Sequence, residues 1–503
     1  MRKKLTRHGA RRLGVAAGLA AVIGLLTASA CAADAAVATV EAESGTLLGG
    51  AAIAADGQSV ERVTREGDGV AVTISAPEDG FYDVIVHSAS VDGGHKENYV
   101  ALDGKRLGVI VNEGREYQDC VIERAYLTAG EHEISVTGYW CWIRVDSVSL
   151  VPSPALPEDL YDVEPVLVNP NASENARRLM TFLCDNYGKR ILSGQYCDKG
   201  MYGLENAAVW RLTGGTYPAI LGLDMIEYSP SRAANGSESK AVEYAIEYWE
   251  AGGIVTFCWH WNAPEKYLTD IWWKGFYQET VSLDLEAIMD GRDEEGYELL
   301  MRDIDAIAAQ LKRLQDAGVP VLWRPLHEAS GGWFWWGHFG PEAYKKLYVT
   351  LYDRLTNVHG LNNLIWVWNG QDPAWYPGDE YVDIIGEDVY AGEHEYEPQT
   401  ARFLAATRYT DARKLVVLSE NGTIFDPELA ARDGAMWGFF CTWSGEFVLR
   451  AEGLNQWSER YTESEAARKA YESELLINRK DLPDLKTYPL REESPARLEK
   501  DEG

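Results

Sequence analysis

Two glutamates lie in segments whose residue types suit acid–base and nucleophilic chemistry. Glu328 lies in VLWRPLHEASGGWFWWG, after Arg324 and His327, and Glu420 lies in KLVVLSENG, after an apolar run. Glycoside hydrolysis needs two such carboxylates: a protonated one to assist the leaving oxygen and an ionised one facing the anomeric carbon. Retaining enzymes hold the two about 5–5.5 Å apart, with no room for water between them. We therefore predict Glu328 as the proton donor and Glu420 as the nucleophile.

Four aromatic residues follow Glu328 after a Gly-Gly pair, from Trp333 to Trp336. Indole rings stack on the C–H faces of sugars, so these residues could form a floor for pyranose rings. They could equally pack a loop against the body of the domain. Glu328 also has a second interpretation, a buried ion pair with Arg324. The sequence leaves both alternatives open.

Other hydrolytic chemistries lack their residue patterns. His327 and Glu328 are followed by Gly331 where a zinc-binding H-E-x-x-H segment needs its second histidine. No G-x-S-x-G segment offers a serine nucleophile, and no C-x-x-C pair offers a zinc or redox site. The formal net charge of −31 disfavours nucleic acid and other polyanions as partners. We expect a neutral polymer as the partner and no cofactor for catalysis.

The chain from Asn169 onward alternates apolar strands with amphipathic helices. Eight runs are expected to be strands: ILSGQY, AILGLDM, GIVTFCWHW, VPVLWRPLHE, NLIWVWNG, VDIIGEDVY, KLVVLSENG and MWGFFCTWSG. Apolar runs without alternation are typical of strands buried on both faces. Eight βα units over about 300 residues indicate an α/β fold, a (β/α)8 TIM barrel. A doubly wound sheet should show a G-x-G-x-x-G turn after its first strand, and ILSGQY has none.

Function in such a barrel collects at the carboxyl ends of the strands. Glu328 follows the fourth strand and Glu420 ends the seventh. These strands lie roughly across the barrel mouth, so the two side chains are expected to converge. The strand ends offer these side chains: Gln195, Asp224, His260, His327, Glu328, Asn369, Asp388, Tyr390, Glu420 and Trp443.

The segment before the barrel follows a different pattern. Short strands such as GVAVTISA and GEHEISVTGYW, with turn signals about every 8–12 residues, predict an antiparallel β-sandwich over 38–152. The proline-rich stretch that follows predicts a linker over 153–168, ahead of the barrel at 169–481. The charged segment 482–503 is expected to be poorly ordered.

The N-terminus has the composition of an export signal over 1–30, because six Lys/Arg residues precede an apolar run and small residues follow. Cys31 stands where a bacterial lipoprotein carries its lipidated cysteine. We therefore expect an exported protein, either secreted or held at a bacterial cell surface by a lipid on Cys31. No other segment is long and apolar enough to span a membrane.

Export would permit disulfides among the chain's seven cysteines. Closeness along the chain allows two pairs, Cys120–Cys141 and Cys184–Cys197.

With these residues in hand, 169–481 resembles glycoside hydrolase family 26. WRPLHEASGGWFWWG resembles the family's acid/base segment, LSENG its nucleophile strand, and YVDIIGEDVY the segment whose tyrosine hydrogen-bonds the nucleophile. The resemblance implies Glu328 as the proton donor and Glu420 as the nucleophile. It also implies substrate-binding roles for His260, Arg324, His327, Trp333, Tyr390 and Trp443.

The commonest members of that family are endo-β-1,4-mannanases. The resemblance therefore implies a retaining, endo-acting mannan endo-1,4-β-mannosidase, with mannan, glucomannan or galactomannan as substrate. The family also contains mixed-linkage β-1,3-1,4-glucanases, which the catalytic glutamates do not separate from mannanases. A non-catalytic glycan-binding lipoprotein is the alternative from another class.

The sandwich resembles carbohydrate-binding module family 35 through VEAESG, ENYVALDGKRLG and GYWCWIRVDSVSL. Many relatives carry asparagine where Arg144 stands, which leaves the ligand open, and a spacer that binds nothing is the alternative reading. The resemblance implies ligand contacts from loop residues, here Tyr99, Trp140, Trp142 and Arg144. It also implies a structural calcium held by the oxygen ligands of Glu41, Glu43 and Asp146.

Overall fold

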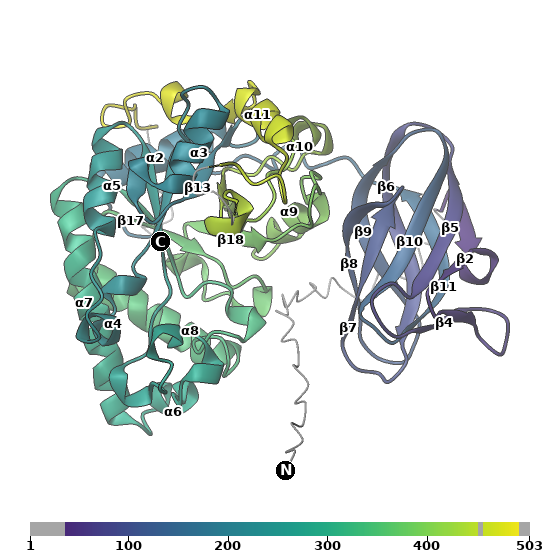
Figure 1. The fold of residues 1–503 in the computed structure, drawn as a ribbon, viewed down its shortest axis with the longest axis horizontal. Coiled ribbons are helices and arrows are strands. Elements are labelled where there is room, and N and C mark those ends of the chain that lie inside the picture. The colour runs from purple at the N-terminus through teal and green to yellow at the C-terminus, as the bar shows by residue number, and fades with distance from the viewer. Residues whose placement is uncertain (1–35, 451–455, 492–503) are drawn as a thin grey trace, which may run out of the picture.

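The computed structural model describes residues 36–450 and 456–491 (Figure 1). An antiparallel β-sandwich precedes a closed eight-stranded parallel barrel, which confirms the predicted fold class. The expected export signal over 1–30 and Cys31 lie outside the described residues. None of the described helices combines the length and the apolar composition of a membrane span.

The sandwich consists of two antiparallel sheets that enclose one hydrophobic core. One sheet has the strand order β3-β4-β11-β6-β9, with β1 paired to β11, and the other has the order β2-β5-β10-β7-β8. Val72, Val86 and Val136 are among the buried residues between them. The strands are β1 (Ala38–Glu41), β2 (Thr46–Leu48), β3 (Ala52–Ile53), β4 (Val60–Val63), β5 (Gly69–Ala76), β6 (Gly80–Ser90), β7 (Lys96–Leu102), β8 (Lys105–Asn112), β9 (Gln118–Leu127), β10 (Gly130–Trp140) and β11 (Ile143–Pro152).

The barrel strands follow one another around the ring in chain order, and all eight expected strands are present. They are β13 (Gly194–Tyr196), β14 (Ile220–Asp224), β15 (Ile254–Trp259), β16 (Val321–Pro325), β17 (Leu364–Trp368), β18 (Ile384–Val389), β19 (Leu415–Asn421) and β20 (Phe440–Thr442). Every residue of β15, β16 and β17 is buried, as strands covered on both faces require. The ring closes where Gln195 pairs with Thr442.

The run ILSGQY is divided in the structure. Only its second half joins the barrel, because Ile191 and Leu192 form β12 (Ile191–Leu192), which pairs with β21 (Leu476–Ile477). This short two-stranded sheet lies outside the closed ring.

Helices surround the barrel (Figure 1). They are α2 (Glu174–Asn186), α3 (Leu204–Leu212), α4 (Pro230–Ala234), α5 (Ala241–Glu250), α6 (Leu285–Met289), α7 (Glu294–Asp316), α8 (Pro341–Tyr352), α9 (Thr400–Ala406), α10 (Pro427–Asp433) and α11 (Ser464–Glu472). Ser173 caps α2, because its side chain accepts a hydrogen bond from the amide of Ala176.

The predicted linker and tail are both packed on the barrel. Tyr161 makes an edge contact with Tyr187 at 5.0 Å between ring centroids. Leu485 is buried, and the hydroxyl of Tyr488 donates a hydrogen bond to Asp185 at 2.8 Å. The expectation of poor order is therefore wrong for 482–491, because apolar side chains in this charged segment find partners on α2.

The six described cysteines are all buried free thiols. The two pairs allowed by closeness along the chain are absent, so that suggestion was wrong. Cys120 instead directs its thiol to the carbonyl of Val111 at 3.1 Å, and Cys197 to the carboxylate of Glu205 at 3.3 Å. Each thiol is satisfied locally, in the manner of a small apolar residue with a weak donor.

Candidate active site

Glu328 and Glu420 meet at the mouth of the barrel. Glu328 follows β16 and Glu420 lies near the end of β19, and one carboxylate oxygen of each lies within 4.8 Å of the other. This separation suits a retaining glycosidase, since inverting enzymes keep the pair about 6.5–9.5 Å apart to admit a water. The structure thus brings together two side chains that are 92 positions apart in the chain.

The backbone at Glu328 is held in an unusual conformation. Strand β16 ends at Pro325, and both Leu326 and Glu328 then have positive φ values, 52° and 53°. Left-handed backbone in a residue with a side chain costs about 1–3 kcal/mol and persists only where neighbours enforce it. Here the amide of Glu328 donates to the carbonyl of Asn369 at 2.7 Å, on the adjacent strand end. The strained turn directs the carboxyl group into the barrel mouth.

Arg324 is fully buried and fixes the carboxylate of Glu420. One guanidinium nitrogen donates to Glu420, and the other donates to Asp388 at 2.6 Å and to Asn369 at 3.1 Å. The hydroxyl of Tyr390 donates to the second oxygen of Glu420. Both oxygens of Glu420 therefore accept hydrogen bonds, which fix the orientation of its carboxyl group as a nucleophile requires.

Glu328 has the opposite environment. Burial, with the charge of Glu420 as the next largest cause, raises the pKa of Glu328 to about 7. The indole nitrogen of Trp333 donates to its carboxyl oxygen at 3.1 Å, which opposes part of this rise in pKa. Near neutral pH a large fraction of Glu328 is therefore protonated while Glu420 lies in a cationic, hydrogen-bonded setting. Unequal environments of this kind separate the acid from the nucleophile.

Three polar side chains form a chain beside the carboxylate pair. Asp224 accepts from Nδ1 of His260 at 2.6 Å, and Nε2 of His260 lies 3.2 Å from Nε2 of His327. Burial opposes protonation of His260, but the charge of Asp224 raises its pKa. Burial, Arg324 and His260 all lower the pKa of His327, so His327 is neutral and accepts from His260. This arrangement fixes the rings of both predicted histidines.

The aromatic residues after Glu328 divide into two groups. Trp333 is partly exposed and contacts Glu328 through its indole nitrogen. Trp335 and Trp336 are fully buried, with their indole nitrogens donating to the carbonyls of Trp261 and His327. Of the two alternatives, packing therefore holds for Trp335 and Trp336, and also for Phe334, which is buried and stacked on Trp336. Trp333 alone of the four is open to a sugar ring.

Trp443, directly after β20, packs against Tyr196 at the end of β13. The Trp443 ring lies 4.7 Å from that of Tyr196 and 5.8 Å from that of His260, centroid to centroid. The hydroxyl of Tyr196 also accepts from Arg324 at 3.1 Å. The sequence predicts Gln195 as the first strand's contribution to the site, but its amide donates to backbone carbonyls inside the barrel. The adjacent tyrosine could have been found by considering both residues of that strand end.

Two clusters of the described residues could in principle hold a metal ion. They are Asp224, Cys258 and His260, and Glu328, Asp388 and Glu420, with donor atoms within 4.8 Å in each. The guanidinium of Arg324 lies among the second set and already provides positive charge there. In the first set, His260 is engaged with Asp224, and burial raises the pKa of the Cys258 thiol well above its usual range. The thiol of the first cluster is therefore not in the ionised form that a metal ligand needs, and the second cluster already has a cation beside it.

The predicted ligand residues of the sandwich occupy different positions. Trp140 and Trp142 flank the turn between β10 and β11, and both are 52% exposed. Arg144 is exposed within β11. Tyr99 lies within β7, not in a loop, with its ring stacked on Tyr139 at 4.5 Å. The turn with its two indoles is the part of this set that presents open aromatic surface.

The predicted calcium ligands are only partly assembled. Glu41 at the end of β1 pairs with Ser147, next to Asp146 on β11. Glu43 lies in the turn after β1, and its Oε2 atom is buried without a hydrogen-bond partner. That orphaned oxygen fits a cation, although the three carboxylates do not converge within 4.8 Å.

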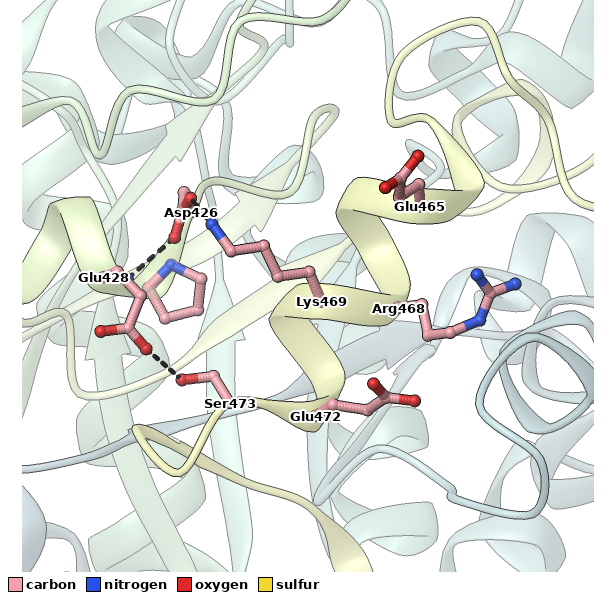
Figure 2. A pocket seen from close by; sticks show the side chains of 8 residues that line it. Asp426, Glu428, Glu465, Arg468, Lys469, Glu472 and Ser473 are labelled. Carbon is pink, nitrogen blue, oxygen red and sulfur yellow. Dashed lines mark hydrogen bonds and ion pairs between the residues drawn. The ribbon is translucent and has the colours of Figure 1, made fainter.

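A surface hollow of about 400 Å³ lies between α10 and α11 (Figure 2). Lys469 pairs with Asp426 at 2.6 Å, and Ser473 donates to Glu428 at 2.9 Å. No aromatic ring lines this hollow, so it lacks a platform for a sugar. The lining residues are Asp426, Pro427, Glu428, Glu465, Arg468, Lys469, Glu472 and Ser473.

Comparisons with known proteins agree with this geometry. Residues 38–153 match carbohydrate binding module family 35. A "Mannan endo-1,4-beta-mannosidase" of Thermothelomyces thermophilus is 41% identical over 388 residues, which are 76% of this chain and 78% of that protein. "Mannan endo-1,4-beta-mannosidase B" of a Piromyces species is 37% identical over 400 residues, 78% of this chain and 68% of that protein.

Solved structures are similar over both domains. The crystal structure of the Podospora anserina GH26-CBM35 β-(1,4)-mannanase has a TM-score of 0.63 and 36% identity, and covers 89% of this chain and 99% of its own. A ruminal GH26 endo-β-1,4-mannanase has a TM-score of 0.63 and 28% identity, covering 88% and 98%. Because residues 168–481 also match the profile of glycosyl hydrolase family 26, the chain belongs to that family.

Proposed function

We propose that this chain is a mannan endo-1,4-β-mannosidase that works by double displacement on Glu328 and Glu420. The proximity of these two carboxylates in unequal environments is the observation that carries the proposal. Membership of family 26 and the names of the similar proteins support β-1,4-mannan as the substrate.

In the first step, a carboxylate oxygen of Glu420 attacks the anomeric carbon while the bond from that carbon to the glycosidic oxygen breaks. Glu328 transfers its proton to the departing oxygen, which leaves as a hydroxyl group. The product is a glycosyl ester of Glu420 and an ionised Glu328. The donors Arg324 and Tyr390 hold Glu420 in one orientation throughout the attack.

In the second step, water enters the place of the departed sugar. Glu328 takes a proton from this water, whose oxygen attacks the anomeric carbon and displaces the carboxylate of Glu420. Two inversions leave the β configuration of the substrate in the product. The proton taken by Glu328 restores the acid for the next cycle.

The remaining predicted residues have roles that their positions suit. Trp333 and Trp443 present rings beside the carboxylate pair and serve as stacking surfaces for sugar rings. His260 and His327, linked to each other and to Asp224, shape the wall of the site next to the cleavage point.

A panel of mannan, glucomannan, galactomannan and barley β-glucan tests the substrate, with sizing of the products. We expect a ladder of soluble oligosaccharides from the mannans and slow release from β-glucan. Proton NMR of the first products should show the β anomer, and early appearance of the α anomer would exclude double displacement. A faster reaction on β-glucan would favour a mixed-linkage glucanase, and binding without hydrolysis a non-catalytic glycan-binding protein.

The sandwich is proposed to bind a neutral glycan through the turn that carries Trp140 and Trp142, with Arg144 beside it. The open indole surface at this turn supports the proposal. A structural calcium near Glu43 would supply positive charge to its orphaned oxygen and tie the start of β1 to the sandwich.

Export is proposed from the composition of residues 1–30, with either release or attachment through a lipid on Cys31. Expression in a bacterium with radiolabelled palmitate tests the attachment. Label in the native chain and its loss in Cys31→Ala would support the lipid anchor, and an unlabelled secreted chain would favour release.

A further inference from the structure

The loop between β18 and α9 contacts the nucleophile at its first residue and the sandwich further along. It begins with Tyr390, whose hydroxyl donates to Glu420. Two residues later, the amide of Gly392 donates to the carboxylate of Glu395 at 2.8 Å, and the carbonyl of Gly392 accepts from Thr423 at 2.9 Å. The carboxylate of Glu395 thus fastens the backbone immediately after Tyr390.

The same carboxylate is held from the other side by the sandwich. Nε of Arg106 lies 3.5 Å from Oε1 of Glu395, and Nζ of Lys105 lies 3.3 Å from Oε1 of Glu397. Both cations stand at the start of β8, directly after a tight turn. The guanidinium of Arg106 is itself placed over the ring of Tyr99 at 3.8 Å, so its position is fixed within the sandwich.

The contact with the loop is one part of a broader interface. The sandwich lies beside the barrel on the side of α9 (Figure 1), and α9 contacts both β8 and β9. Ala401 on α9 packs against the hydrophobic core of the sandwich. Arg408 pairs with Glu123 at 2.7 Å, and Arg124 donates to the carbonyl of Asp433 at 2.8 Å. Two ordered surfaces therefore meet, and the loop carrying Tyr390 lies at their boundary.

We propose that Lys105 and Arg106 of the sandwich are positioning residues for the reaction, which brace the Glu395–Glu397 segment and thereby hold Tyr390 against Glu420. The sandwich then has a role in catalysis that is separate from glycan binding. This inference rests on the proposed function, because it assigns a kinetic effect to the contact between Tyr390 and the nucleophile.

The expected effect is modest, because the ion pairs are partly open to solvent. Lys105 is 70% and Arg106 36% exposed, whereas Glu395 and Glu397 are each 22% exposed. Pairs of this kind contribute little individually. We expect the Lys105→Ala/Arg106→Ala variant of the full-length chain to lose about two- to fivefold in kcat, with KM nearly unchanged, since exposed pairs give small effects.

The test uses β-1,4-mannohexaose, a soluble substrate for which the glycan affinity of the sandwich should not limit the rate. The decisive comparison is with Tyr390→Phe. If the cations act through Tyr390, removing them in the Tyr390→Phe background should change kcat by less than their effect in the native background. A full additional loss in that background, or native kcat in the double alanine variant, would overturn the proposal.

Two further variants separate positioning from a general loss of structure. Glu123→Gln removes another interface ion pair that does not contact the loop, and it should leave kcat unchanged.

Lys105→Glu should lower kcat, and adding Glu397→Lys should restore it by re-forming the pair with reversed charges. Equal losses in Glu123→Gln and the double alanine variant would contradict the brace. Failure of the native chain to cleave the hexaose would instead reject the proposed function itself.

Discussion

Replacing Glu328 by alanine should affect substrates according to how much they need a proton. Mannan requires protonation of its leaving oxygen, and a positioned general acid contributes about 10²–10⁴-fold to such a step. The Glu328→Ala variant should therefore lose about that factor in kcat/KM on mannan. A dinitrophenyl β-mannobioside releases dinitrophenolate, a stable anion that needs no proton, so the first step of its cleavage should be preserved within about tenfold.

The pH dependence gives a second reading of the same replacement. Because the pKa of Glu328 is raised to about 7 and the reaction needs its protonated form, kcat/KM of the native enzyme should fall as the pH rises through that value. In Glu328→Ala with the dinitrophenyl substrate, this alkaline limb should disappear. Steady-state assays from pH 4 to 9 measure both effects.

The matched control is Glu420→Ala, which should be inactive on both substrates because it lacks the attacking oxygen. The assignment would be refuted if Glu328→Ala hydrolysed mannan at near-native rates. It would also be refuted if the variant kept the alkaline limb on the activated substrate, since another group would then supply the proton.

Three further predictions concern Trp333, Glu328 and the turn of the sandwich that carries Trp140 and Trp142. Trp333→Phe removes the indole hydrogen bond that lowers the pKa of Glu328, so the alkaline limb of kcat/KM should move to higher pH. An unchanged limb would mean that this hydrogen bond, at 3.1 Å, has no effect on the pKa of the carboxyl group. Glu328→Gln should stabilise the fold above pH 7 by about 4 kcal/mol, because a carboxyl whose pKa is about 7 when folded and about 4.3 when unfolded loses folding stability as the pH rises between these values. Thermal unfolding should show this gain at pH 8 and only about 1 kcal/mol of it at pH 5, and equal gains at the two pH values would contradict the raised pKa. Trp140→Ala/Trp142→Ala should weaken retention on insoluble mannan without altering kcat on mannohexaose, and pull-down assays with unchanged retention would remove this turn from glycan binding.

The sequence was sufficient for the barrel because its strands carry a strong and simple signal. LIWVW at 364–368 is apolar throughout, and all of it is buried. Once eight such runs were counted, the positions of Glu328 and Glu420 at the ends of the fourth and seventh strands predicted that they converge. Their convergence within 4.8 Å depends on barrel closure, which the chain order of the strands implies.

Contacts between side chains that lie far apart in the chain could not be predicted from the sequence. Asp388 was recognised as a strand-end residue, but its pairing with Arg324 could not be inferred, because any of several carboxylates could have filled that position. The burial of Trp335 and Trp336 was equally undetermined, since the same indole composition suits a sugar platform or a packed loop. The order of 482–491 was not predicted, because the tail 482–503 as a whole is charged and contains prolines, and the partners of Leu485 and Tyr488 are known only from the fold.

Burial and the charge of Glu420 explain why the two glutamates have different roles. Arg324 contacts both Glu420 and Asp388, and burial raises the pKa of Asp388 well above its usual range. Burial is the main reason that Glu328 keeps its proton, and repulsion from the charge of Glu420 is the second. Formation of the glycosyl ester removes the charge of Glu420. The repulsion between the two carboxylates is then lost, the pKa of Glu328 falls, and its ionisation becomes easier. The geometry that keeps Glu328 acidic before the first step therefore makes it a base for the second.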